Sequence, residues 1–313
     1  MFKRLLSLYN GSKPSQLALE WAVKLGEIYH ADLKVLSVIE ETKPDRLPLE
    51  KSQQLVNHIR TEIDKDVRQF STRENQLALE KIEIEVATGK PIKTILPYLK
   101  AQAPDLVVLG GHSRAGILPH LLGGVAEKVV RHSPFPILIP RKDFHWPPTK
   151  VLVPVDVLDY STEIFEILTR MSSQHSIEIH LLHVMPLFIP ANPTFLGDDG
   201  LFYDPKELEH QSLSQMDQLR AAYPNLEIKA HVVLGSPAQE ICRFAEENQI
   251  DLVILSTHGH EGLTHLLIGS VAEQVVRYIP CTALVYHLPS TVAARQRVLS
   301  RLAENDAEIG VGD

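Results

Sequence analysis

Short apolar runs of strand length alternate along the chain with longer segments whose apolar positions follow helical spacing. In the first half, the strand-like segments are 5–9, 32–39, 81–89, 105–110 and 135–140. The helix-like segments between them are 14–30, 49–73, 91–102 and 123–132. Pro91 suits the first turn of its helix, whereas Pro97 should kink or shorten it.

The second half of the chain repeats this order. Residues 105–139 align without a gap onto residues 251–285, at an offset of 146 positions, with 16 of 35 positions identical. The same offset places the run 5–10 on 151–156 and Gly89 on Gly235. An offset that holds across most of a unit indicates duplication.

Strands that alternate with helices of about ten or more residues predict parallel sheets with helices on both faces. Continuous branched runs such as 106–108 fit strands buried on both sides. The sequence therefore predicts an α/β protein with two tandem doubly wound, Rossmann-like domains. Because Pro147 and Pro148 interrupt regular structure, we expect domains at 1–146 and 147–289 and a tail at 290–313.

The composition of the chain excludes some classes of partner. The chain has 313 residues, 44% of them hydrophobic, and a formal net charge of −8, which argues against nucleic acid as a partner. No apolar run is long enough to span a membrane, so we expect no membrane partner and a cytoplasmic protein. Two cysteines without C-x-x-C spacing, Cys242 and Cys281, fit reduced packing residues.

The connection after the late strand of the second half, 256–270, is the strongest candidate for chemistry. Ligands of doubly wound sheets bind outside the carboxyl ends of the strands. Gly259 and Gly269 would let the backbone approach a ligand, and a helix that starts near Ser270 would offer free N–H groups to a phosphate. Taken alone, the spacing also fits an ordinary loop in which Ser270 is only an N-cap.

A family resemblance favours the ligand. The spacing G-x2-G-x9-G-[ST] followed by V-A-E-x-V, together with a first strand VLVPVD that ends in Asp156, resembles the universal stress protein family. The resemblance covers both halves except the tail. It implies the adenine-nucleotide α-hydrolase-like fold and ATP as ligand. It leaves open whether Mg²⁺ or Mn²⁺ accompanies the phosphates, because the nucleotide would hold most of such a metal. It also implies pairing through the last strand, which would join the halves as a pseudo-dimer and allow a further homodimer.

Family members that bind ATP hold it between two strand ends and this loop. Carried over by resemblance, the residues beside adenosine and adenine are Pro154, Val155, Asp156 and Val184. Those that follow the ribose and phosphates are Ser256, Thr257, His258, Gly259, Gly269, Ser270, Val271 and Ala272. Ser256 stands where the motif has glycine.

The N-terminal copy departs further from the motif. Asn10 replaces the aspartate, Ser113 replaces the second glycine and Gly124 replaces the hydroxyl residue, while Gly110 and Gly123 remain. These changes predict weak nucleotide binding or none in this half. The alternative is that Asn10 still accepts a hydrogen bond and that Gly124 leaves an adequate helix start.

The sequence offers less support for a metal site or for catalytic residues. His258, His260 and His265 lack the spacing of a zinc site, and we expect no metal site of the protein's own. Asp105 and Asp251 precede strands, where a structural capping role is expected. We expect no dedicated catalytic residues and at most slow ATP hydrolysis, in a stress protein that acts through conformation or an unidentified protein partner. An adenylating enzyme of the same fold group and a ligand-free scaffold remain the alternatives.

Overall fold

The computed structural model describes residues 2–40, 49–71, 82–111, 123–156, 162–173, 175–185, 205–256 and 269–286. Contacts between residues divide the chain into two compact units. Unit 1 comprises Met1–Trp146, Ser256–Gly269 and Thr282–Asp313, and unit 2 comprises Pro147–Leu255 and Ser270–Cys281.

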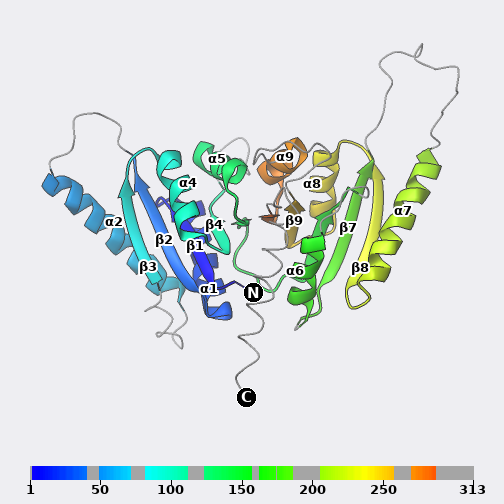
Figure 1. The fold of residues 1–313 in the computed structure, drawn as a ribbon, viewed down its shortest axis with the longest axis horizontal. Coiled ribbons are helices and arrows are strands. Elements are labelled where there is room, and N and C mark those ends of the chain that lie inside the picture. Colours follow the sequence, from blue (N-terminus) through cyan, green and yellow to red (C-terminus); the bar gives the residue numbers. More distant parts are fainter. Residues whose placement is uncertain are drawn as a thin grey trace, which may run out of the picture. The chain divides into compact units, whose positions relative to one another are not determined.

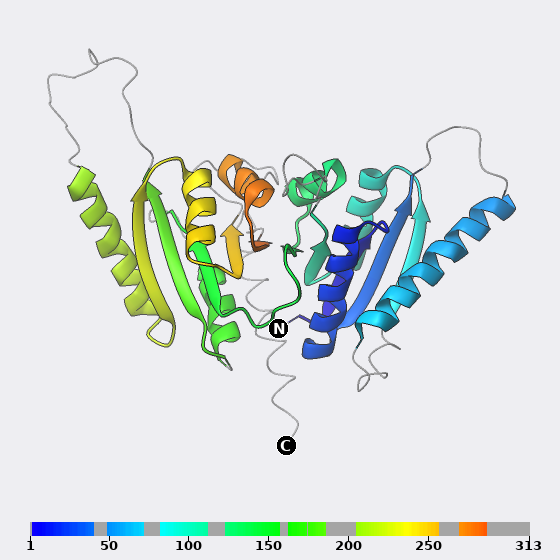
Figure 2. The ribbon, with the colours of Figure 1, turned by 180° about the vertical axis from the view of Figure 1, so that it is seen from behind.

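Unit 1 contains a sheet in the order β3-β2-β1-β4-β5-β10. Its strands are β1 (Arg4–Tyr9), β2 (Asp32–Ile39), β3 (Ile82–Thr88), β4 (Leu106–Leu109), β5 (Ile137–Ile139) and β10 (Thr282–Tyr286). Its helices are α1 (Lys13–Tyr29), α2 (Leu49–Phe70), α4 (Pro91–Gln102) and α5 (Gly124–His132). Helices α4 and α5 cover one face of this sheet (Figure 1), and α1 and α2 cover the other (Figure 2).

Unit 2 repeats the arrangement with strands in the order β9-β6-β7-β8. These strands are β6 (Lys150–Pro154), β7 (Glu178–Met185), β8 (Glu227–Leu234) and β9 (Leu252–Ser256). The helices are α6 (Thr162–Ser172), α7 (Pro205–Ala222), α8 (Pro237–Glu247) and α9 (Ser270–Tyr278). All of the pairings among these four strands are parallel, as expected for crossover connections through helices.

The predicted α/β fold class is confirmed. In unit 1, β1, β2, β3, β4 and β5 pair in parallel, and only β10 runs antiparallel, with Leu284 opposite Leu138 on β5. The expected pairing of the last strands of the two repeats is therefore present.

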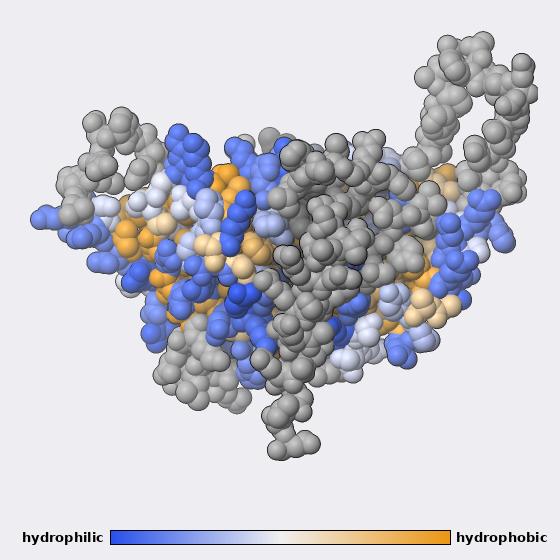
Figure 3. All heavy atoms as spheres, in the orientation of Figure 1, coloured by the Kyte–Doolittle hydropathy of each residue, from blue (hydrophilic) through white to orange (hydrophobic). Residues whose placement is uncertain are grey.

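Burial explains why the central strands read as continuous apolar runs. All four residues of β4 are buried, and Leu252 to Leu255 of β9 are buried as well. Helices cover both faces of such strands, so polar side chains would lose their solvation there. Figure 3 shows mostly hydrophilic side chains over α2 and α7, the helices that follow β2 and β7.

Pro97 does not shorten α4, so of the two expected effects the shortening is wrong and the kink stays a prediction. The helix runs from Pro91 to Gln102 with Pro97 inside it. Proline removes one helical hydrogen bond. Packing compensates for this loss, because Ile95 is 5% exposed and Leu99 is completely buried.

Two aspartates close the amino-terminal edges of the two sheets in the same way. The Asp105 carboxylate accepts hydrogen bonds from the backbone N–H groups of Lys3 and Arg4, both at 2.9 Å. The Asp251 carboxylate accepts from the backbone N–H groups of Thr149 at 2.9 Å and Lys150 at 3.0 Å. The structural role expected for these residues is thus confirmed.

An aromatic cluster fixes the segment that leaves unit 1. The Trp21 indole on α1 donates to the backbone oxygen of Lys142 at 3.0 Å, and the Trp146 indole donates to the Tyr29 hydroxyl at 2.9 Å. Phe144 packs edge-on against Trp21, with ring centroids 5.0 Å apart. The end of unit 1 is therefore attached to α1 by both packing and hydrogen bonds.

Candidate functional site

The carboxyl ends of β6, β7 and β9 lie at one edge of unit 2, because the three strands are parallel neighbours. Immediately after β6, the Val155 N–H donates to the Leu182 carbonyl of β7 at 2.9 Å. The His183 ring nitrogen Nδ1 lies 3.1 Å from the Val155 carbonyl. Both backbone polar groups of Val155 therefore bond to β7, which holds the chain in place just before the exposed Asp156.

His183 is a site-edge residue that the sequence analysis missed. It is half-buried at the carboxyl end of β7, next to the predicted adenine neighbour Val184. Its position near the carboxyl end of the strand, after the apolar pair Leu181 and Leu182, was the available signal, because a polar residue near a strand end commonly has a specific partner.

The first turn of α9 is exposed on one side and buried on the other. Ser270 is exposed, Val271 is 39% exposed, and Ala272 is 7% exposed. Figure 1 places α9 at the edge where β7 ends. The first N–H groups of a helix have no partner within the helix, and they carry the positive end of its dipole.

The other predicted site residues are placed only in part. Pro154 closes β6, Val184 lies buried near the end of β7, Ser256 ends β9, and Gly269 immediately precedes α9. Thr257, His258 and Gly259 lie outside the described residues, as do His260 and His265. The described residues include no group of three or more His, Cys, Asp or Glu suited to a metal ion.

In unit 1 the counterpart of Asp156 is engaged in a local turn. The Asn10 side-chain oxygen accepts hydrogen bonds from the Ser12 N–H at 3.2 Å and the Ser12 hydroxyl at 2.7 Å. The Ser12 hydroxyl oxygen in turn accepts from the Ser15 N–H at 3.4 Å and caps α1. The Asn10 oxygen thus has two donors within the protein.

A cavity of about 270 Å³ lies beside this turn. Its walls come from β1, β2, β4, α1, α4 and α5, and the polar groups on its lining belong to Tyr9, Asn10, Ser12, Ser15 and Glu40. The Tyr9 hydroxyl donates to Asp66 at 2.7 Å. Burial, followed by this hydrogen bond, raises the pKa of Tyr9 to about 12.

Gly110, the first motif glycine of unit 1, allows the start of α1 to pack closely against the end of β4. A Cβ atom added to it would lie 2.3 Å from the Pro14 carbonyl oxygen and 2.6 Å from the Ser15 nitrogen. Only glycine allows the start of α1 to approach β4 this closely. At Ser256, the corresponding position, a Cβ is present, and the residues that correspond to Pro14 and Ser15 lie outside the described residues.

Among the described residues, no helix is both long enough and sufficiently apolar to span a bilayer. The two cysteines are free thiols, with Cys281 buried and Cys242 half-buried.

Comparisons with known proteins agree in both halves of the chain. The universal stress protein E homolog of Haemophilus influenzae is 28% identical over 308 residues, which cover 90% of this chain and 96% of that protein. Universal stress protein MJ0531 of Methanocaldococcus jannaschii is 28% identical over 144 residues, 45% of this chain and 82% of its own. The crystal structure of a universal stress protein from Archaeoglobus fulgidus shares the fold, with a TM-score of 0.64 at 20% identity and coverage of 91% and 98%.

A family model gives the most direct evidence. The model of the universal stress protein family matches this chain twice, at residues 1–141 and at residues 148–287. Together the two matches cover nearly the whole chain apart from its end, and each corresponds to one copy of the repeat. The chain therefore belongs to the universal stress protein family and carries the family's domain twice in tandem.

Proposed function

We propose that this protein binds ATP or another adenine nucleotide, mainly in its C-terminal half, and acts in a stress response through a change of conformation or of protein partner. The observation that carries the proposal is the edge of unit 2 at which the exposed Asp156 follows β6 and the exposed turn Ser270–Val271 begins α9. Asp156 would accept hydrogen bonds from ribose hydroxyls. The free N–H groups of α9 would bind phosphate oxygens.

The remaining parts of the site follow from the family resemblance. Thr257, His258 and Gly259 would follow the ribose and phosphates, and Val184 would lie against adenine. Mg²⁺ or Mn²⁺ would be held largely by the phosphates. We assign no catalytic residue, so slow ATP hydrolysis is the most activity that the proposal allows, and we expect the protein to act in the cytoplasm, alone or as a homodimer.

Unit 1 supports a difference between the halves. The Asn10 oxygen is already bonded to Ser12, and the α5 start has Gly124 in place of a hydroxyl residue. We therefore propose that the N-terminal half binds nucleotide weakly or not at all.

Isothermal titration calorimetry with ATP, combined with native mass spectrometry of the purified protein, tests the proposal. We expect one nucleotide per chain. We expect Asp156→Ala and Gly259→Val each to weaken binding at least about tenfold, which corresponds to about 1.4 kcal/mol of binding free energy. Asn10→Ala is the matched control and should leave the affinity unchanged. Equal losses in Asp156→Ala and Asn10→Ala would show that the assignment to one half is wrong.

Two other results would favour a different function. The absence of any nucleotide binding by the wild-type chain would overturn the proposal and favour a ligand-free scaffold. Rapid pyrophosphate release that depends on an added substrate would favour an adenylating enzyme. As a converse test, Asn10→Asp combined with Ser113→Gly and Gly124→Ser should raise the stoichiometry towards two nucleotides per chain.

A further inference from the structure

Two histidines form a close pair on two neighbouring strands of unit 2, near the start of β7 and in the middle of β8. His180 lies on β7 and His231 on the neighbouring strand β8, and their ring atoms Nδ1 and Nε2 are 3.1 Å apart. The two rings are stacked, with centroids 5.2 Å apart and an angle of 19° between their planes. Phe244 of α8 packs against both, at centroid distances of 5.6 Å and 4.8 Å. His180 is only 4% exposed.

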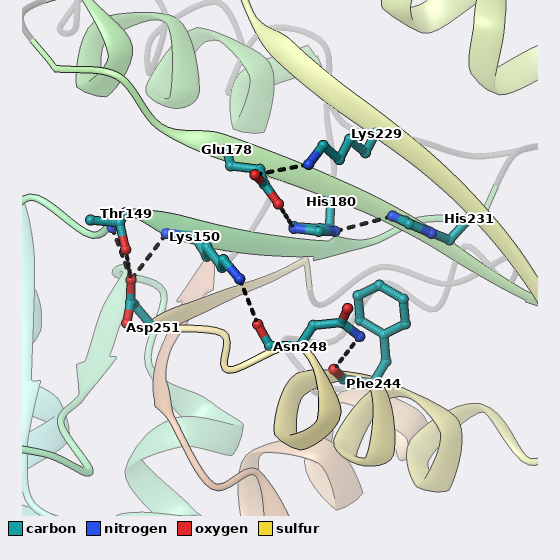
Figure 4. A network of polar contacts seen from close by, with 9 residues as sticks. All are labelled: Thr149, Lys150, Glu178, His180, Lys229, His231, Phe244, Asn248 and Asp251. Carbon is teal, nitrogen blue, oxygen red and sulfur yellow. Dashed lines mark hydrogen bonds and ion pairs between the residues drawn. The ribbon is translucent and has the colours of Figure 1, made fainter.

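Charged side chains surround this pair (Figure 4). On β7, one carboxylate oxygen of Glu178 lies 2.6 Å from His180 Nε2, and the other lies 2.9 Å from the Lys229 ammonium on β8. Lys150 reaches in from β6 and donates to the Asn248 backbone oxygen at 3.2 Å. From α8 and its C-cap, Figure 4 shows the uncharged side chains of Phe244 and Asn248.

These distances indicate where the protons lie. The negative charge of the Glu178 carboxylate, 2.6 Å from His180 Nε2, favours a proton on that nitrogen. His180 Nδ1 then has a free lone pair, and it accepts the hydrogen bond from His231 Nε2–H. One further proton fits on His231 Nδ1. A second would place N–H groups on both of the facing nitrogens, which are only 3.1 Å apart.

The surroundings favour the uncharged pair. Burial lowers the pKa of His180, and the positive charges of Lys229 and Lys150 lower it further, while Glu178 opposes both effects. Burial also lowers the pKa of His231, followed by the charge on His180 and that of Lys229. An unfolded chain therefore takes up protons on these two rings at a higher pH than the folded protein does.

The same place in unit 1 has no histidine. At the offset of 146 positions, His180 corresponds to Lys34 and His231 to Glu85. There Lys34 pairs with Glu83 at 2.7 Å, and Glu85 accepts a hydrogen bond from the Tyr98 hydroxyl at 2.6 Å. Unit 1 thus provides an internal control with the same topology and no histidine at these two positions.

We propose that the His180–His231 pair is a proton-sensitive contact through which mild acidification weakens the attachment of β8 and α8 to β7. The sign follows from linkage. The stability that the uncharged pair contributes is fully present above about pH 6.5, the ordinary pKa of histidine. It is lost as the pH falls through the lower pKa values of the two rings in the folded protein. The proposal does not depend on nucleotide binding.

Histidine NMR titration of the wild-type chain is the first test. We expect two of the ring signals to titrate together, in a coupled transition below that of the exposed histidines. Hydrogen exchange can be compared from pH 7.5 to pH 5 after correction for the intrinsic chemical exchange rate. Protection of the β8 amides should fall by up to about tenfold per pH unit for each proton that is taken up when the strand opens. Protection in β3, the unit 1 counterpart, should stay constant.

A matched pair of variants completes the test. His231→Gln keeps a side-chain N–H donor but does not titrate, so it should remove most of the pH dependence of β8 protection. His210→Gln, at an exposed position on α7, should behave like the wild type. Independent titration of both rings at the ordinary histidine value would overturn the proposal, and so would a His231→Gln variant with unchanged pH dependence.

Discussion

Gly110 lies so close to Pro14 that a single added carbon would collide with the backbone. The Cβ of an alanine there would sit 2.3 Å from the Pro14 carbonyl oxygen and 2.4 Å from its carbonyl carbon. Backbone atoms cannot rotate away, so β4 and α1 would have to separate.

Gly110→Ala should therefore destabilise unit 1 by about 2–3 kcal/mol, as other overpacked cores are. Urea unfolding followed by far-ultraviolet circular dichroism measures this loss. Gly124→Ala is the control, because a Cβ there meets nothing within 4 Å, and the variant should be unchanged or up to about 1 kcal/mol more stable. Equal effects of the two substitutions would contradict the packing role.

Asp251→Ala should destabilise unit 2 by about 2 kcal/mol. The substitution leaves the N–H groups of Thr149 and Lys150 without their carboxylate acceptor, and hydrogen bonds to charged groups contribute about 1.5–3 kcal/mol. Urea denaturation can be compared with Asp217→Ala, which removes an exposed i,i+3 ion pair with Arg220 and should cost less than about 0.5 kcal/mol. A loss in Asp251→Ala as small as in this control would show that the carboxylate does not hold the sheet edge.

Tyr9 should ionise late in an alkaline titration. Its pKa is about 12, compared with an ordinary value near 10, so the folded state favours the neutral phenol. The stability that it contributes is complete below about pH 10 and is lost as the pH rises through 12.

Tyrosinate absorbance measures this directly, since Tyr9→Phe should remove one late transition. Tyr278→Phe, at a side chain that is 48% exposed, should leave that transition in place. If Tyr9→Phe instead removes an early transition, the hydrogen bond to Asp66 does not persist in solution.

The thiols should react slowly in the native protein. Burial raises the pKa of Cys242 to about 11, so at pH 8 about one thiol in a thousand is ionised, and Cys281 is completely buried. We expect a disulfide reagent to modify the folded chain at least about a hundredfold more slowly than the chain in urea. Cys242→Ser and Cys281→Ser variants assign the residual reaction, and fast stoichiometric labelling of either thiol would contradict the burial.

The order of elements was predictable because the hydrophobic period reports burial directly. The segment 32–39 was expected as a strand and forms β2, and the segment 91–102 was expected as a helix and forms α4 despite Pro97. The effect of Pro97 was not predictable, since the packing of Leu99 against the sheet depends on residues distant in sequence.

The site was predictable only in outline. The resemblance directed attention to Asp156 and Ser270; Asp156 follows β6, Ser270 begins α9, and both are exposed. A sequence motif does not specify which atoms lie next to a glycine. The packing of Gly110 against Pro14 could therefore be recognised only from the structure. The pairing of His180 with His231 was missed for the same reason, although each histidine shares a strand face with a charged residue two positions earlier, Glu178 and Lys229.

The aromatic cluster that packs against α1 gives unit 1 an optical readout of its own. The chain has two tryptophans, Trp21 and Trp146, and their ring centroids are 6.4 Å apart within unit 1. Intrinsic indole fluorescence therefore reports on unit 1 and on the release of its final segment, and it carries no emitter from unit 2. Unfolding curves recorded by fluorescence and by circular dichroism should separate wherever the two units lose structure at different denaturant concentrations.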